Sequence, residues 1–336
     1  MKTTVLLINL GTPASPSTAD VRSYLGQFLN DPRVVDLPWL LRKILVNLII
    51  VPFRAPQSAK IYQKLWTEQG SPIIFHGEKV RALLQEKLGA DYSVELAMRY
   101  KEPSIPGTLE RIRQSNPDRI IVLPLFPQYA SASTGSAIEE VMDVIKGWWV
   151  IPDLSFISQY WDHPEFVRAL IERGKQYDWR DYDHVLFSYH GLPERQVDKV
   201  YDSGLCQDRD CEHEITPENK FCYKAACYGT TRLLAAGLGI PEDHYTVCFQ
   251  SRLDKKWLEP FADKVVLEQA AKGAKKLLVF SPSFVADCLE TTIEIGDEYH
   301  HLFIEHGGEK VQLVESLNDH PAWISALEKL VKETAG

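Results

Sequence analysis

Short apolar runs recur along the whole chain and alternate with segments of helical patterning. In the first half they cover residues 5–9, 94–98 and 120–125. In the second half they cover residues 154–158, 184–188, 245–251, 276–281 and 310–315. Such runs, each of a few residues and separated by helices, are typical of strands buried in a parallel sheet. The sequence therefore predicts an α/β protein built from doubly wound, Rossmann-like parallel sheets.

The length of the chain predicts more than one lobe, because 336 residues exceed the usual size of a single domain. The alternation of strands and helices restarts after residues 148–153. We therefore expect an N-terminal lobe over 1–150 and a C-terminal lobe over 151–315, with a cleft between them. Residues 316–336 should form a helix that packs back on the body. Ligands of such sheets bind beyond the carboxyl ends of the strands.

The composition excludes some function classes. With 37 basic and 46 acidic residues the net charge is -9, which argues against a general nucleic-acid binder because phosphate neutralisation needs clustered Lys and Arg. The first residues enter an apolar run without a basic leader and cleavage site, so we expect a cytoplasmic protein. The most apolar stretch, 38–52, is shorter than the roughly 18–20 residues that span a bilayer. It contains Arg42 and Lys43 and is either an apolar lip or a core helix.

A row of carboxylates follows the run at 276–281. Asp287, Glu290, Glu294, Asp297 and Glu298 recur at spacings of about three and four residues, which places them on one side of a predicted helix. Like charges at these spacings oppose helix formation. The row is either a solvated face or a ladder that passes cations or protons to a site at the end of the strand.

His190 lies at the predicted carboxyl end of another strand, directly before Gly191. This is a favoured place for a reactive side chain. If the strands ending at 188 and 281 are close in the sheet, Glu290 enters the same crevice. A histidine and a carboxylate together can move protons near neutral pH.

Polar side chains also follow two strands of the first half. Arg99 and Tyr100 come after one, and Ser131, Ser133 and Thr134 come after the other. An arginine beside small hydroxyls and an aromatic ring suits a flat ligand that carries carboxylates.

Four of the six cysteines are clustered. Four residues separate Cys206 from Cys211 and Cys222 from Cys227, and ten lie between the two pairs. In a reducing compartment such clustering indicates metal rather than disulfides. An iron-sulfur cluster, zinc and no metal at all remain open from the spacing.

Taken together, the motifs resemble those of the ferrochelatases, which insert ferrous iron into a porphyrin. They occur in the family's order over nearly the whole chain: NLGTP, VRSYLGQFLNDPRVVDLP, QSAKIYQKLW, GSPI, AMRY, LPLFPQYASASTGS, SYHGLP, CYGTTRLLA, FQSR, KKWLEP and FVADCLETTIEI. A match of so many motifs in the same order is not expected by chance.

The resemblance implies roles for individual residues. His190 would be the catalytic residue and Glu290 its partner, both next to the substrate iron. Glu294 and Glu298 would form a proton exit or a metal path. The motifs that line the porphyrin pocket place there Arg54, Tyr62, Arg99, Tyr100, Phe126, Ser131, Ser133 and Trp257. The chain departs from some members at Cys288, where they carry a second histidine; Cys288 is either a soft ligand or a small buried residue.

The resemblance also implies partners. The substrates would be protoporphyrin IX and ferrous iron, and the four cysteines would hold a [2Fe-2S] cluster, as in some bacterial ferrochelatases. Residues 38–52 would form a lip that accepts the porphyrin, with peripheral contact at the inner membrane. Two alternatives are a chelatase for another tetrapyrrole, such as coproporphyrin III, and a non-catalytic porphyrin or haem carrier. The oligomeric state is left open.

Overall fold

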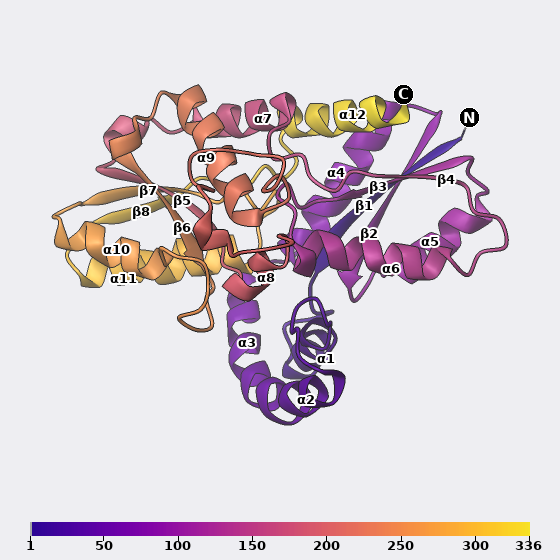
Figure 1. Ribbon diagram of the computed structural model, residues 1–336, viewed down its shortest axis with the longest axis horizontal. Coiled ribbons are helices and arrows are strands. Elements are labelled where there is room, and N and C mark those ends of the chain that lie inside the picture. The colour runs from indigo at the N-terminus through magenta and orange to yellow at the C-terminus, as the bar shows by residue number, and fades with distance from the viewer. Residues whose placement is uncertain (1) are drawn as a thin grey trace. The chain divides into compact units, whose positions relative to one another are not determined.

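The computed structural model describes residues 2–336, which form two compact units (Figure 1). Unit 1 comprises the residues up to 126 together with 130–158 and 324–336, and unit 2 comprises 127–129 and 159–323. Each unit contains its own four-stranded parallel sheet, in the orders β2-β1-β3-β4 and β6-β5-β7-β8. The predicted pair of parallel sheets is confirmed.

The sheet of unit 1 has helices on both faces. Its strands are β1 (Thr3–Gly11), β2 (Tyr92–Tyr100), β3 (Arg119–Pro124) and β4 (Asp153–Phe156). The helices α5 (Ile105–Gln114) and α6 (Ser136–Ile145) cover one face, and α4 (Pro72–Leu88) and α12 (Pro321–Ala335) lie on the other (Figure 1). The short π-helix η2 (Ser131–Gly135) leads into α6. Leu6, Ile8 and Val122 are fully buried against α5 and α6.

The strand predicted at 154–158 belongs to unit 1, so its assignment to the second lobe was wrong. In β4, Leu154 pairs with Ile120 and Ser155 with Ile121, both on β3. The chain leaves β3, crosses through α6 and returns to the free edge of β3, as parallel strands joined by a helix do. The alternation of strands and helices that belongs to unit 2 therefore begins after this strand and not before it.

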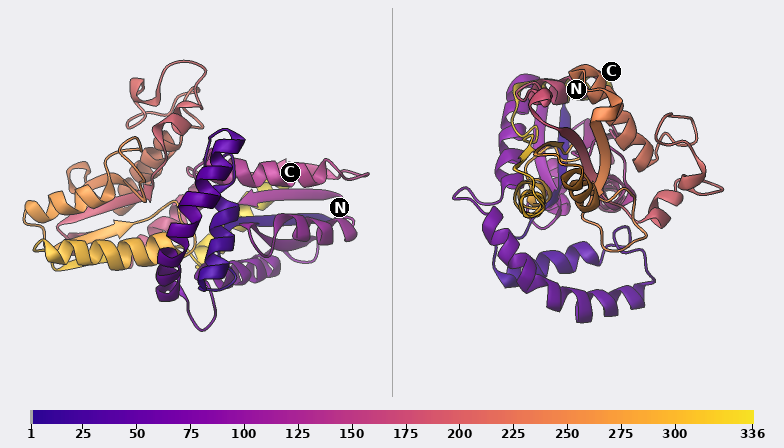
Figure 2. Two further views of the ribbon diagram at one scale, coloured as in Figure 1. Left: turned by 90° about the horizontal axis from the view of Figure 1, so that it is seen from below. Right: turned by 90° about the vertical axis from the view of Figure 1, so that its left-hand side faces the viewer.

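A helical segment of unit 1 projects away from its sheet (Figure 1 and Figure 2). It consists of α1 (Thr18–Leu29), α2 (Trp39–Ile44), the π-helix η1 (Leu45–Ile50) and α3 (Val51–Leu65). Tyr62 of α3 is buried and meets the ring of Tyr24 on α1 edge-on at 6.2 Å. Large apolar side chains are exposed along α2, η1 and the first turn of α3: Trp39, Leu40, Leu41, Ile44, Leu48, Ile49 and Phe53. None of the helices described in residues 2–336 is long and apolar enough to cross a membrane.

Unit 2 repeats the layered plan. Its strands are β5 (His184–His190), β6 (Tyr245–Gln250), β7 (Lys276–Phe280) and β8 (Lys310–Leu313). Figure 1 shows α7 (Pro164–Gly174) and α9 (Tyr223–Leu238) on one face, and α10 (Ala262–Ala271) and α11 (His300–Glu305) on the other. The remaining helices are α8 (Glu194–Asp198), η3 (Trp179–Asp181), η4 (Cys206–Asp208), η5 (Glu242–His244) and the π-helix η6 (Leu289–Tyr299). Leu277, Val279 and Ile295 are buried between the sheet and the α10 side.

Candidate active site

His190 is the last residue of β5 and is half-buried. Its Nδ1 lies 2.6 Å from the carbonyl oxygen of Gly191. A carbonyl oxygen can only accept a hydrogen bond, so Nδ1 carries the proton and Nε2 of the neutral ring carries the lone pair. The rings of Trp257 and Phe284 each lie 6.4 Å from the imidazole, centroid to centroid. The imidazole therefore lies near two aromatic side chains and has Nε2 available as a proton acceptor.

Gly191 must be a glycine because the backbone after His190 passes very close to the neighbouring strand. A Cβ here would lie 2.8 Å from the backbone oxygen of Gln250 and 3.2 Å from the Trp257 ring. The same close approach lets the Gly191 N–H donate to the Gln250 carbonyl at 2.8 Å. The turn that orients His190 is thus tied directly to the end of β6.

Glu290 lies at the same edge of the sheet, where its backbone carbonyl accepts a hydrogen bond from Gln250 at the end of β6. The strands β5 and β7 are neighbours, with Phe187 paired to Phe280, which confirms the predicted closeness of the strands that end near 188 and 281. The π-helix η6 begins at Leu289 and holds Glu290, half-buried, in its first turn. Turns of π-helix are frequent at functional sites.

Cys288 is 8% exposed, as expected for a small buried residue. Burial, then the charge of Glu290 and a hydrogen bond to it, raise the pKa of the Cys288 thiol well above its usual range. These effects favour the neutral thiol as a hydrogen-bond donor to the Glu290 carboxylate.

The predicted row of five carboxylates on one α-helix was wrong in two respects. Asp287 precedes the helix, and its carboxylate accepts hydrogen bonds from the backbone N–H of Ser316 at 3.1 Å and from the Asn318 side chain at 2.8 Å. The helix itself is a π-helix, whose wider turn changes the spacing of one face. Glu294 is half-buried, whereas Glu298 is exposed.

A cavity of about 390 Å³ adjoins Glu294 on the carboxyl side of β6. Its lining residues are Phe249, Gln250, Ser251, Arg252, Leu253, Asp263, Glu294 and Tyr299.

The residues predicted from unit 1 differ widely in their surroundings. Arg54 is exposed on α3, and Phe126 and Ser133 are half-buried. Ser131 accepts a hydrogen bond from Arg33 at 2.8 Å. Tyr62, on α3, lies in the contact with α1 described above. These residues come from separate elements of the unit.

Arg99 and Tyr100 converge on a carboxylate that sequence reasoning missed, Asp31. Arg99 Nη2 and the Tyr100 hydroxyl donate to Asp31 Oδ2 at 2.8 and 2.9 Å, and the Ser136 hydroxyl donates to it at 2.5 Å. Tyr100 has no exposed surface, and burial followed by the charge of Asp31 raises its pKa. Both predicted residues thus build the interior of unit 1. Asp31 lies in the loop after α1, where no periodic pattern marks it.

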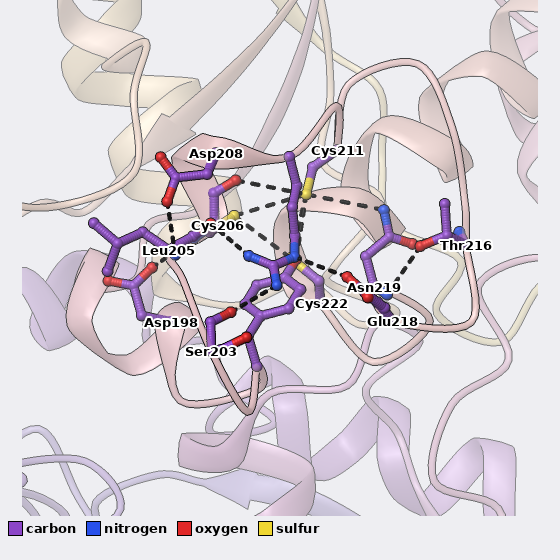
Figure 3. A network of polar contacts seen from close by, with 12 residues as sticks. Asp198, Ser203, Leu205, Cys206, Asp208, Cys211, Thr216, Glu218, Asn219 and Cys222 are labelled. Atoms are coloured by element: carbon purple, nitrogen blue, oxygen red, sulfur yellow. Dashed lines mark hydrogen bonds and ion pairs between the residues drawn. The ribbon is translucent and has the colours of Figure 1, made fainter.

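Three of the four clustered cysteines come together in unit 2 (Figure 3). The sulfur of Cys206 lies 3.8 Å from that of Cys211 and 3.7 Å from that of Cys222, and the latter two are 4.0 Å apart. All three are buried. Hydrogen bonds from the other two thiols lower the pKa of Cys211. Cys227, on α9, is fully buried beside Tyr223 and outside this group.

The three cysteines fit one tetrahedral metal ion. With metal–sulfur bonds of 2.3 Å, as for zinc, two ligands of a tetrahedral ion are about 3.8 Å apart. A [2Fe-2S] cluster takes four cysteines, two on each iron, and would need Cys227 in addition to these three. Two residues missed in the sequence support the trio: the Tyr201 hydroxyl lies 3.3 Å from the Cys211 sulfur, and the Asn219 amide lies 3.9 Å from it.

Solved structures share the fold. SirB from Bacillus subtilis with Fe³⁺ has a TM-score of 0.57 at 15% identity, covering 100% of this chain and 96% of that one. The sirohydrochlorin chelatase SirB from Bacillus subtilis subspecies spizizenii, in complex with cobalt, has a TM-score of 0.53 with the same identity and coverage. At this identity the likeness concerns the fold alone.

Sequence relatives are much closer. The ferrochelatase family model matches residues 2–335. A ferrochelatase from Legionella pneumophila (strain Lens) is 43% identical over 337 residues, covering 99% of each chain. One from Coxiella burnetii (strain Dugway 5J108-111) is 43% identical over 333 residues, covering 98% of this chain and 93% of the relative. On these matches, which span both units, the chain belongs to the ferrochelatase family.

Proposed function

We propose that this chain inserts ferrous iron into protoporphyrin IX to form protohaem, with His190 as the base and Glu290 as its partner. The single observation that supports these roles best is the orientation of His190, whose Nδ1 faces the Gly191 carbonyl at 2.6 Å and leaves Nε2 as the acceptor. The family membership supports the reaction, and the position of both residues at one edge of the unit 2 sheet supports the pairing.

Metal insertion requires a base because the porphyrin loses two N–H protons as Fe²⁺ binds its four nitrogens. His190 Nε2 can accept one proton directly from the ring. The Glu290 carboxylate can take the second proton or ligate the incoming iron. Trp257 and Phe284, whose ring centroids each lie 6.4 Å from that of the imidazole, provide aromatic surface for the flat ring. The balance is one Fe²⁺ bound and two protons released.

The predicted porphyrin contacts of unit 1 divide into two groups. Arg54, Phe126, Ser131 and Ser133 have exposed surface, and we propose them as contacts to the ring or its carboxylates. Tyr100 has none, and Arg99 is hydrogen-bonded to Asp31 and Ser136. We therefore propose that this pair, like the buried Tyr62, supports the pocket wall from within. Coproporphyrin III carries more carboxylates than protoporphyrin IX and would need additional cations.

An anaerobic insertion assay tests the function. Purified protein is mixed with ferrous iron and either protoporphyrin IX or coproporphyrin III, and product formation is followed by absorbance. We expect faster turnover with protoporphyrin IX. Preference for coproporphyrin III would favour the other tetrapyrrole chelatase, and porphyrin binding without turnover would favour a carrier.

We also propose that Cys206, Cys211 and Cys222 bind a resident metal centre. Its two forms differ in their use of Cys227, since a [2Fe-2S] cluster needs this fourth thiolate and a single tetrahedral ion does not. Thiolate ligation would supply structural support to residues 199–222, which have little regular structure. No step of metal insertion depends on it.

Metal analysis of anaerobically purified protein checks this centre. We expect one centre per chain that is lost in Cys211→Ser and kept in Cys248→Ser, because Cys248 lies buried on β6. Iron with equal acid-labile sulfide, lost in Cys227→Ser, would identify the [2Fe-2S] cluster. One zinc that survives Cys227→Ser would identify the single ion. Metal-free protein would contradict the proposal.

The exposed apolar side of α2, η1 and α3 supports a peripheral contact with lipid at the cytoplasmic face of the inner membrane, which we propose as the location of the enzyme. Trp39, Leu48 and Phe53 are 66%, 69% and 75% exposed. Contiguous apolar surface of this kind marks interaction sites. Arg42, one of the two cations in residues 38–52, is buried and donates to the Leu37 carbonyl at 2.8 Å, so the contact is mainly apolar.

Sedimentation with vesicles of phosphatidylethanolamine and phosphatidylglycerol checks the lipid contact. The double variant Leu48→Ser, Phe53→Ser is expected to bind at least about 10²-fold more weakly, because each buried side chain contributes about 1.5–3 kcal/mol. Leu253→Ser removes a side chain of similar exposure, 63%, from unit 2 and should leave binding unchanged. Equal binding by all three proteins would rule out this surface.

A further inference from the structure

Gln250 ends β6 at the point where the sheet meets the proposed site. It pairs in register with His190 on β5, and its carbonyl accepts the hydrogen bond from Gly191. Its side chain is buried, with 1% of its surface exposed. A buried amide of this kind must have its polar atoms satisfied by the protein.

The side-chain amide of Gln250 joins the two elements that bear His190 and Glu290. Its Oε1 accepts a hydrogen bond from Ser188 on β5 at 2.7 Å. Its Nε2 donates to the backbone carbonyl of Glu290 at 2.8 Å and to Glu294 Oε2 at 3.0 Å. Both of these oxygens only accept, so the orientation of the amide is determined by its neighbours. One side chain therefore connects the strand of the base to the first turn of η6.

Glu294, which accepts a hydrogen bond from this amide, accepts hydrogen bonds from other groups as well. Its carboxylate also accepts from the backbone N–H of Ser251 at 2.8 Å, from the Ser251 hydroxyl at 2.5 Å and from the Tyr299 hydroxyl at 2.9 Å. With Gln250 this makes four donors, and a carboxylate offers about four acceptor positions. Ser251 has a φ of +62°, a left-handed conformation that these two hydrogen bonds stabilise. The carboxylate of Glu294 thus has a donor at each of these acceptor positions.

We propose that Gln250, anchored by Glu294, is a positioning residue that fixes Glu290 relative to His190 for metal insertion. On this account Glu294 is an anchor rather than a step of a metal or proton path. The inference rests on the proposed roles of His190 and Glu290. Misplacement of a catalytic group by about 1 Å can lower a rate about 10²-fold, so loss of the amide should appear mainly in kcat.

The test compares Gln250→Leu with Tyr299→Phe in the insertion assay. Gln250→Leu removes the connection to Glu290, whereas Tyr299→Phe removes one hydrogen bond from the same Glu294 carboxylate without touching Glu290 or His190. We expect Gln250→Leu to lower kcat about 10²-fold, and Tyr299→Phe to lower it less than about threefold, with the porphyrin KM little changed in both. Circular dichroism and porphyrin binding verify folding. Equal loss of kcat in the two variants would overturn the proposal.

A second variant keeps the proposal testable if Gln250→Leu does not fold. In Gln250→Glu two carboxyl groups share one site, which raises the pKa of one of them. Below that pKa the introduced carboxyl is protonated and donates an O–H to its neighbours. The ratio of variant to wild-type kcat should therefore rise as pH falls from about 8 to about 6. A ratio independent of pH would overturn the positioning role, whereas an inactive wild-type protein would refute the proposed function instead.

Discussion

Replacing His190 by alanine is expected to lower kcat for iron insertion by about 10²–10⁴-fold, the usual contribution of a positioned general base. The variant loses Nε2, the atom that would accept a pyrrole proton. Porphyrin binding should persist because Trp257 and Phe284 remain. Turnover is measured in the anaerobic insertion assay, and binding is measured by quenching of porphyrin fluorescence.

A matched control lies at the other end of the same strand. His184 is the first residue of β5, and its Nε2 lies 2.8 Å from the Thr246 hydroxyl. His184→Ala removes an imidazole from β5 at the edge opposite the proposed site and should leave kcat nearly unchanged. Insertion by His190→Ala at the wild-type rate would remove His190 from the mechanism.

Replacing Asp31 by alanine is expected to lower the free energy of unfolding by about 3–5 kcal/mol, as for the loss of one partner of a buried ion pair. The Arg99 guanidinium, 13% exposed, would lose the carboxylate 2.8 Å away. Tyr100 and Ser136 would lose the acceptor of their hydroxyl groups. Urea denaturation followed by circular dichroism measures the change.

The control for Asp31 is an ion pair nearer the surface of the same unit. Arg33 and Glu139 lie 2.7 Å apart, with side chains 34% and 42% exposed. Glu139→Ala should cost at most about 1 kcal/mol, because solvent screens such a pair. If the two variants lowered stability equally, the buried network around Asp31 would not be the stronger support of unit 1.

Local patterns were enough to predict the strands and the position of His190. The apolar run before His190 became β5, and His190 became its last residue. The neighbouring runs at 245–251 and 276–281 became β6 and β7, which flank β5. These predictions succeeded because strand burial and the carboxyl end of a strand depend on consecutive residues.

Sequence patterns were less informative where the structure depends on contacts between residues far apart in the chain. The spacing of the carboxylates predicted one helix that carries all five, yet Asp287 precedes the helix and accepts hydrogen bonds from Ser316 and Asn318. The spacing of the cysteines predicted four neighbours, yet only three of them gather within 4.8 Å among the described residues. The strand at 154–158 was assigned to the wrong sheet because the apolar pattern of a strand does not indicate which other strand it pairs with.

The sequence by itself determined that this chain forms parallel sheets flanked by helices, that His190 ends a strand, and that its motifs are those of the ferrochelatases. Only the tertiary structure decided that Glu290 lies in the first turn of a π-helix, that Gln250 joins this turn to the strand of His190, and that Asp31 accepts hydrogen bonds from Arg99 and Tyr100. The physical reason is the separation of the interacting residues along the sequence. Periodicity and turn chemistry act between residues close in the sequence, whereas Gln250 meets Glu290 across 40 residues and Asp31 meets Tyr100 across 69.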